Sequence, residues 1–148
     1  MRLRASLVLV LVLLLVLGLG TKAQANENVW SALVVATNAP FPPQPPFEMR
    51  HIAATLSRTF GYNYFNLIGQ SRKVLQSGEE NWMARSKHFS LRVDARGATR
   101  DGYRLKLQLF QDRHVLLETD ATLSKRSPLV IRGPQIGAGQ LLLLVIVQ

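Results

Sequence analysis

The stretch Leu141-Leu142-Leu143-Leu144-Val145-Ile146-Val147 is apolar at every position. A strand with one wet face alternates apolar and polar residues, whereas a strand covered on both faces reads as a continuous apolar run. We therefore expect this stretch to be a central β-strand. The earlier segments are then expected to cover its two faces.

Three segments upstream of this run show the alternation that is typical of half-exposed strands. They are residues 89–95, 103–110 and 115–123. If the last two form an antiparallel hairpin around residues 111–113, Arg104 and Lys106 project from the outer face of one strand. Glu118 and Asp120 project from the other, so cross-strand ion pairs would help to fix the register, contributing about 0.2–1 kcal/mol each.

Further strands are predicted where β-branched, aromatic or apolar residues cluster. These segments are 29–37, 62–68, 82–85 and 128–131, with a bend or bulge at Gly69. The segment 40–46 contains five prolines, which favour an extended connector. The alternative for this segment is a ligand for a proline-recognising domain.

One helix is predicted, over residues 47–60. Pro46 suits a helix start and Gly61 suits a helix end. An apolar stripe at helical spacing is expected to pack on the sheet, and it consists of Met49, Ile52, Ala53, Leu56 and Phe60. The predicted fold is a single α+β domain over residues 26–148, with a mostly antiparallel sheet of about six strands and one helix packed on one face.

Residues 1–25 have the pattern of an export signal. Arg2 and Arg4 precede an unbroken apolar run over residues 7–17, and Ala23-Gln24-Ala25 provides small residues at the cleavage spacing. The alternative is an uncleaved membrane anchor, but the apolar stretch of residues 5–20 is shorter than the roughly 20 residues that span a bilayer. We expect a periplasmic or extracellular location, with membrane anchoring only if the signal is retained.

The sequence contains no cysteine, which removes disulfides, thiol catalysis and thiolate metal sites. For an exported domain this favours a bacterial envelope over a eukaryotic secretory route. Arg2, Arg4 and Lys22 lie in the signal, so the rest of the chain has 15 Lys and Arg against 9 Asp and Glu, a formal charge of +6. This charge predicts at most a weak attraction to an anionic membrane surface.

No catalytic chemistry is expected. Glu48 and His51 have the Glu-x-x-His spacing of carboxylate-bridged metal sites, but such sites need this pair twice, and a solvated helix surface is favoured. His88 and His114 lie in separate segments, and no G-x-S-x-G turn is present. We therefore predict a protein that is not an enzyme, with no catalytic, cofactor-binding or metal-ligating residues and no cofactor.

Two other patterns are interpreted as structural. The glycine-containing segment 133–139 lacks the phosphate-loop spacing and indicates a hairpin connection. Residues 58–65 mix basic and aromatic side chains, as in some RNA-binding sheets, but the order of residues differs from that signature and export argues against such a ligand. No nucleic-acid partner is expected.

The segment order resembles that of small exported proteins of Gram-negative bacteria that have no assigned activity, and its small α+β style is similar in architecture to accessory modules of envelope and secretion machines. The matching features are Phe60-Gly61-Tyr62, Leu67-Ile68-Gly69, Phe89-Ser90-Leu91-Arg92-Val93, the segment 128–134 and Gly139-Gln140-Leu141. The resemblance covers most of residues 26–148. Because these motifs are turns and strands, it implies no catalytic residues.

Three functions follow as hypotheses. The first is a non-catalytic binding or accessory module of the cell envelope, which contacts an envelope protein through a sheet edge or an aromatic surface near residues 62–82. The second is a periplasmic binder of lipid or of a small apolar ligand, with the helix closing a pocket over the final strand. The third is a hydrolase. The identity of the partner and the oligomeric state stay open.

Overall fold

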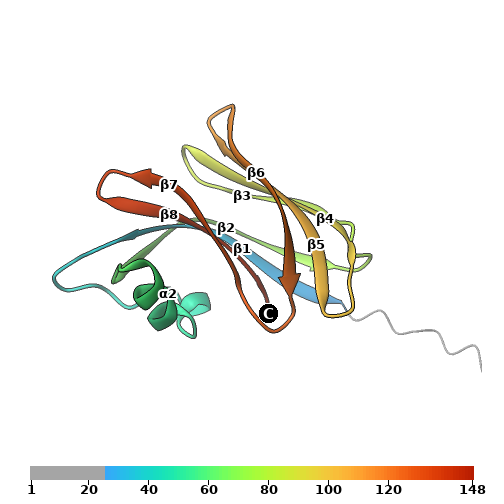
Figure 1. Ribbon diagram of the computed structural model, residues 1–148, viewed down its shortest axis with the longest axis horizontal. Helices are drawn as coiled ribbons and strands as arrows, with labels where there is room; N and C mark the ends of the chain where they lie inside the picture. The colour runs from blue at the N-terminus through green and yellow to red at the C-terminus, as the bar shows by residue number, and fades with distance from the viewer. Residues whose placement is uncertain (1–25) are drawn as a thin grey trace, which may run out of the picture.

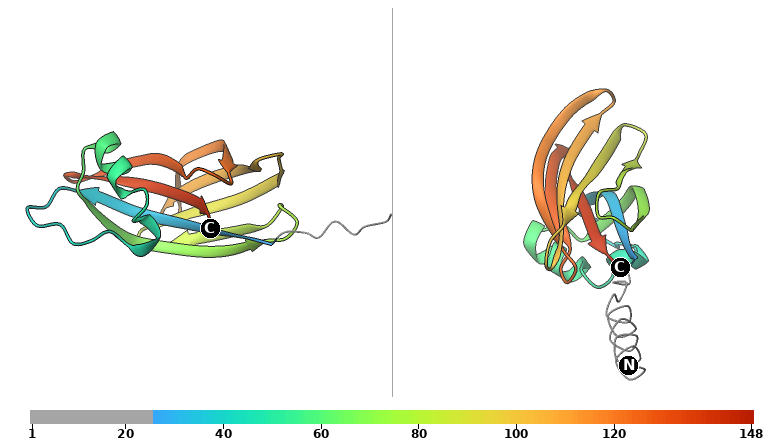
Figure 2. Two further views of the ribbon diagram at one scale, coloured as in Figure 1. Left: turned by 90° about the horizontal axis from the view of Figure 1, so that it is seen from below. Right: turned by 90° about the vertical axis from the view of Figure 1, so that its right-hand side faces the viewer.

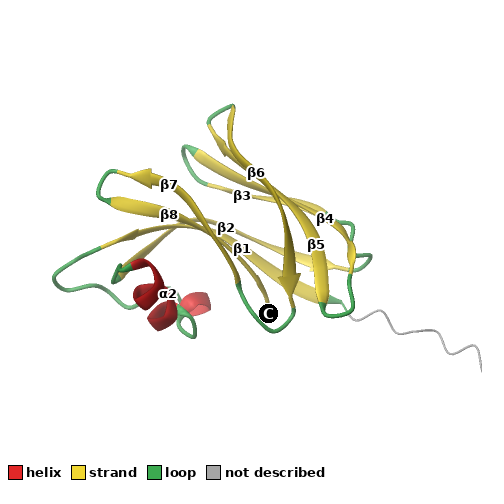
Figure 3. Ribbon diagram, in the orientation of Figure 1, coloured by secondary structure: helices red, strands yellow, loops and turns green. Residues whose placement is uncertain are grey.

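The computed structural model describes residues 26–148, so the predicted export signal lies outside the described residues. Figure 1 shows a chain built mainly of strands, with one short helical layer, and Figure 3 colours the two kinds of element separately. The strands are β1 (Glu27–Thr37), β2 (Tyr64–Leu75), β3 (Asn81–Arg85), β4 (Phe89–Ala98), β5 (Gly102–Gln111), β6 (His114–Ser124), β7 (Leu129–Ile136) and β8 (Gly139–Val147). The helical elements are a 3-10 helix, η1 (Phe47–Met49), and the α-helix α2 (Ala53–Phe60).

The strands form two antiparallel sheets of four strands each. Sheet A has the order β2-β1-β8-β7, and sheet B is the meander β3-β4-β5-β6. The antiparallel α+β character is confirmed, but the prediction of a single sheet of about six strands is wrong. Alternation identifies the buried face of a strand and does not tell which of two stacked sheets the strand joins.

The apolar run of residues 141–147 lies in β8, between β1 and β7, as predicted. Its side chains alternate between two cores. Leu141, Leu143 and Val145 face sheet B, and Leu142, Leu144 and Ile146 face the helix. All six are almost completely inaccessible to solvent, which explains why the run has no polar interruption.

Two apolar cores therefore lie on opposite sides of sheet A, and Figures 1 and 2 show the three layers that enclose them. The inter-sheet core lies between sheets A and B and contains Trp82 and the inward leucines of β4 and β5. The helix-side core lies between sheet A and α2 and contains Trp30. The chain has two tryptophans, so each core holds one.

The helical segment is shorter than predicted. The 3-10 helix η1 has hydrogen bonds from the Met49 and Arg50 amides to carbonyls three residues earlier, and α2 begins only at Ala53. This tighter turn brings both Met49 and Ile52 into the helix-side core. The rest of the prediction holds, because Leu56 is buried in the same core, Ala53 and Phe60 pack against it, and Gly61 ends α2 at φ 78°.

The bulge predicted at Gly69 is present. Gly69 pairs with Leu33 whereas Leu67 pairs with Val34, so Ile68 is the extra residue of β2. A Cβ atom at Gly69 would collide with the Arg85 carbonyl at the end of β3. Glycine is therefore needed where sheet A comes against the first strand of sheet B.

The hairpin of β5 and β6 has the predicted arrangement. Lys106 pairs with Asp120 in register, and its ammonium lies 2.8 Å from the carboxylate of Glu118. Arg104 pairs instead with Thr122, and its guanidinium contacts the Arg96 carbonyl at 3.5 Å. Across residues 26–148, no helix is both long and apolar enough to cross a bilayer.

Candidate functional site

Within residues 26–148, β6 is an edge strand of sheet B, and its outer edge is the first candidate site. At the other end of sheet B, β3 has only five residues. In sheet A, β7 is interrupted by an irregularity between Arg132 and Gln135 that contains Pro134, and β2 carries the bulge beside Gly69. Short strands, prolines and bulges are the usual protections of an edge against pairing with another chain.

The strand β6 is 11 residues long and contains no proline. Like β2 it carries one bulge, near its start, where Leu116 is the extra residue between the pairs Val115–Phe110 and Leu117–Leu109. It differs from β2 in that β2 comes against the end of β3 at Gly69. Two large apolar side chains at this end are exposed, Val115 at 51% and Leu116 at 43%. This edge therefore combines free backbone hydrogen-bonding groups with apolar side chains in solvent.

A groove between α2 and β7 is the second candidate site. It has a volume of about 370 Å³ and is lined by Ile52, Thr55, Leu56, Thr59, Phe60, Pro128 and Val130. At one end the guanidinium of Arg132 lies over the Phe60 ring, 5.2 Å from its centroid. At the other end Pro128 is shared with a smaller depression of about 100 Å³, which His51, Lys125 and Arg126 also line.

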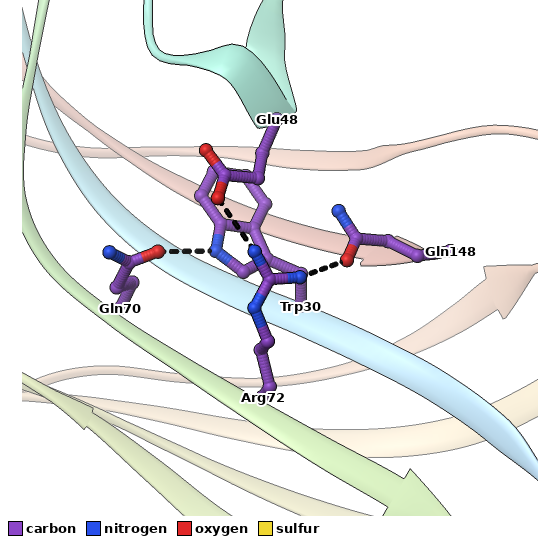
Figure 4. Close-up of polar contacts among 5 residues, drawn as sticks. All are labelled: Trp30, Glu48, Gln70, Arg72 and Gln148. Carbon is purple, nitrogen blue, oxygen red and sulfur yellow. Dashed lines mark hydrogen bonds and ion pairs between the residues drawn. The ribbon is translucent and has the colours of Figure 1, made fainter.

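The Glu48 and His51 pair does not form a common polar surface. The Glu48 carboxylate accepts a hydrogen bond from Arg72 Nη2 at 2.6 Å, and Arg72 also donates to Gln148 (Figure 4). Next to it, Trp30 Nε1 donates to Gln70 at 2.8 Å. This cluster ties η1 to β2 and to the end of β8, while His51 stays exposed beside the smaller depression. The solvated surface predicted for Glu48 is therefore wrong, because its side chain is paired and only 17% exposed.

The other two histidines lie in sheet B or beside it. His88 Nδ1 is 3.7 Å from the Asp112 carboxylate, and His114 pairs with Gln111 at the start of β6. All three histidines of the chain are exposed. Over the part of the chain that the structure describes, no three His, Cys, Asp or Glu side chains gather as metal ligands would.

The aromatic surface expected near residues 62–82 is not formed. Phe65 and Trp82 are 5% and 8% exposed, and Tyr62 and Tyr64 are half-buried. The Trp82 indole crosses the inter-sheet core and donates to the buried hydroxyl of Ser31 at 2.8 Å. Phe65 belongs to the helix-side core and Trp82 to the inter-sheet core, so the two face different layers.

The segment 133–139 is a hairpin connection, as predicted, and most of it is strand. Residues 133–136 belong to β7, and Gly137, at φ 57°, lies in the tight turn into β8. The Gln140 side-chain amide donates to the Gly133 carbonyl, which ties the irregular part of β7 to β8. The glycines therefore serve the hairpin geometry.

Glu27 joins three separate segments at one end of the sandwich. Its carboxylate accepts a hydrogen bond from the Tyr103 hydroxyl at 2.9 Å and lies 2.6 Å from the Lys125 ammonium. Burial, together with the hydrogen bond and the negative charge of Glu27, raises the pKa of Tyr103 to about 12. This arrangement connects β1, β5 and the crossover from β6 to β7.

No protein-family model, no curated protein and no solved structure matches this chain. Sequence analysis predicted a pocket between the helix and the final strand and did not place it at β7, although residues 49–63 and 125–147 share a signal, the absence of Asp and Glu.

Proposed function

We propose that this protein is a non-catalytic binding module of the bacterial cell envelope, exported by the signal in residues 1–25, that recruits a partner protein through the edge of β6. The observation that carries the proposal is the long, proline-free β6 edge with Val115 and Leu116 exposed beside it. An extended segment of a partner can add to such an edge, with affinity from main-chain hydrogen bonds and specificity from the side-chain contacts.

Two further observations support this role. The polar side chains that sequence analysis singled out do not converge, since Glu48 is paired with Arg72 while His88 lies beside Asp112. The clusters of polar and charged side chains around Glu27 and Arg72 instead hold separate segments of the fold together. Both observations favour a binding scaffold over a catalyst.

Site-specific photocrosslinking tests the proposal. A photoreactive phenylalanine analogue at Leu116 in the exporting bacterium should give one discrete adduct with an envelope protein. The matched control is Val74 on β2, which is 44% exposed on the other sheet and should give no such adduct. Val115→Lys should abolish the Leu116 adduct, because a lysine at a strand edge opposes pairing. Equal crosslinking from both positions, or none from Leu116, would refute an interface at β6.

The groove between α2 and β7 supports a second candidate function, the binding of a small apolar ligand. Its volume of about 370 Å³ is within the range of roughly 300–1,000 Å³ that is typical of ligand sites. Its walls come mainly from Ile52, Leu56 and Val130, with threonines at the rim. The ligand site predicted between the helix and the final strand is thus proposed one strand further along the sheet, over β7.

A further inference from the structure

We propose that the groove between α2 and β7 binds a medium-chain anionic amphiphile as a free monomer, with the acyl chain in the groove and the carboxylate at the end near His51 and Arg126. The inference rests on the second candidate function above and specifies its ligand. It depends on the shape of the groove, on its apolar floor and on the sign of the charge around it.

The groove has the length and lining for a short acyl chain. It follows α2, whose eight residues span about 12 Å. Ile52 and Leu56 are buried at its base, and Pro128 and Val130 form the opposite wall. The buried apolar base and the threonine rim suit an apolar chain.

The charge around the groove has one sign. The segments that line it and flank it, residues 49–63 and 125–147, contain five Lys and Arg and no side-chain carboxylate. The cations are Arg50, Arg58, Lys125, Arg126 and Arg132. Most of the nine acidic residues lie on sheet B, in the turn before β3 or in the paired clusters of Glu27 and Glu48.

Lys125 is already paired with Glu27, but the four arginines carry no such partner. Arg50, Arg58, Arg126 and Arg132 make no ion pair with any carboxylate within residues 26–148. Arg132 is held over the Phe60 ring and Arg126 lines the depression that meets the groove at Pro128. A carboxylate can therefore pair with Arg126 while its chain runs past Val130 toward Phe60, with Arg132 adding long-range attraction.

Three probes with the same chain test the charge preference: decanoate, decanol and decyltrimethylammonium. Each is titrated below its aggregation limit into the exported protein, and backbone amide shifts are followed by NMR. We expect decanoate to bind with shifts confined to α2, residues 126–132 and the end of β8. Decanol should bind roughly tenfold more weakly, and the cation more weakly still.

Variants locate the two parts of the site. Thr59→Trp adds an indole at the exposed rim and should block all three probes by filling the groove. Arg126→Gln with Arg132→Gln should reduce decanoate affinity to the level of decanol and leave decanol unchanged. The matched control is Arg113→Gln, in the turn between β5 and β6 on the far sheet, which should bind decanoate as the unaltered protein does. Thermal unfolding of each variant verifies that the fold is retained.

The outcomes separate the two proposals. If decanoate and decanol bind equally at the groove, the apolar site stands and the anionic preference is wrong. If none of the probes binds there, both are wrong. Binding to vesicles of anionic phospholipid without binding of monomeric decanoate would also overturn the inference, because it would indicate a bilayer surface rather than a single chain as the occupant.

Discussion

At the scale of single residues, Glu80 organises the turn between β2 and β3, where the chain passes from sheet A to sheet B. Its carboxylate accepts hydrogen bonds from the amides of Gln76, Ser77 and Gly78 at 2.7–2.9 Å and from the Ser77 hydroxyl at 3.0 Å. Partial burial raises its pKa, but the hydrogen bonds from Ser77 and Gln76 outweigh burial and lower the pKa to about 2.

We therefore predict that Glu80 stabilises the fold only where its carboxylate is ionised. Because the pKa is lowered in the folded state, this stabilisation is present above about pH 4.5 and is lost as the pH falls toward about 2. Glu80→Gln should lower the free energy of unfolding by about 1–2 kcal/mol at neutral pH, with the difference shrinking in acid. Urea denaturation at several pH values measures this.

Glu79→Gln, at the exposed neighbouring position, is the control for that measurement. It should change stability by less than about 0.5 kcal/mol at every pH. A deficit in Glu80→Gln that stayed constant down to about pH 2 would show that the carboxylate charge is not what orders the turn.

At the scale of elements, the contact between β2 and β3 depends on the absence of a side chain at position 69. Gly69→Ala would place a methyl group against the Arg85 carbonyl, so one of the two strands must move. We predict a loss of about 1–3 kcal/mol in the free energy of unfolding, as for other overpacked sites. Asn66→Ala, at an exposed position of the same strand, should be nearly neutral in the same denaturation assay.

The sequence predicted the elements better than their assembly. The apolar run of residues 141–147 and the alternation in β4 to β6 identified their strands correctly, because each pattern records which faces of one segment are buried. The stripe from Met49 to Phe60 identified the buried residues but not the break between η1 and α2. The pairing of Glu48 with Arg72 was not predictable, since it joins residues 24 apart through the packing of η1 on sheet A.

The second sheet was missed for a related reason. Trp82 and Phe65 could belong to a core or to a binding surface, and the assembly of the layers decides: sheet B covers Trp82, and the helical layer covers Phe65. The pocket was predicted over the final strand and not over β7, because the two walls of the groove, α2 and β7, are about 70 residues apart in the sequence. Charge asymmetry along the chain indicated which segments were basic, but not that they lie side by side.

At the scale of the whole molecule, sheet A is shared by both cores, so the three layers should unfold together. Leu143 and Leu144 are neighbours in β8, yet one packs in the inter-sheet core and the other in the helix-side core. We predict that Leu143→Ala and Leu144→Ala each cost about 2–5 kcal/mol, with a single transition in both variants.

The two tryptophans provide a reporter for each core. Trp82→Phe leaves Trp30 in the helix-side core, and Trp30→Phe leaves Trp82 in the inter-sheet core. In each of these backgrounds, the fluorescence midpoint in urea should coincide with the midpoint from circular dichroism. If Leu144→Ala shifted the Trp30 signal to lower urea while the Trp82 signal kept its midpoint, the helical layer would be an independent unit.

The position of β8 between β1 and β7 also determines when sheet A can assemble during folding. During synthesis or passage through a channel, β1 emerges near the beginning, and its neighbour on the side away from β2 arrives more than 100 residues later. Until β8 has emerged through Val147, the edge of β1 that pairs with it lacks its partner strand, and sheet A cannot form completely. We therefore expect sheet A to assemble only once the last strand is available, which leaves the edge of β1 unpaired until then.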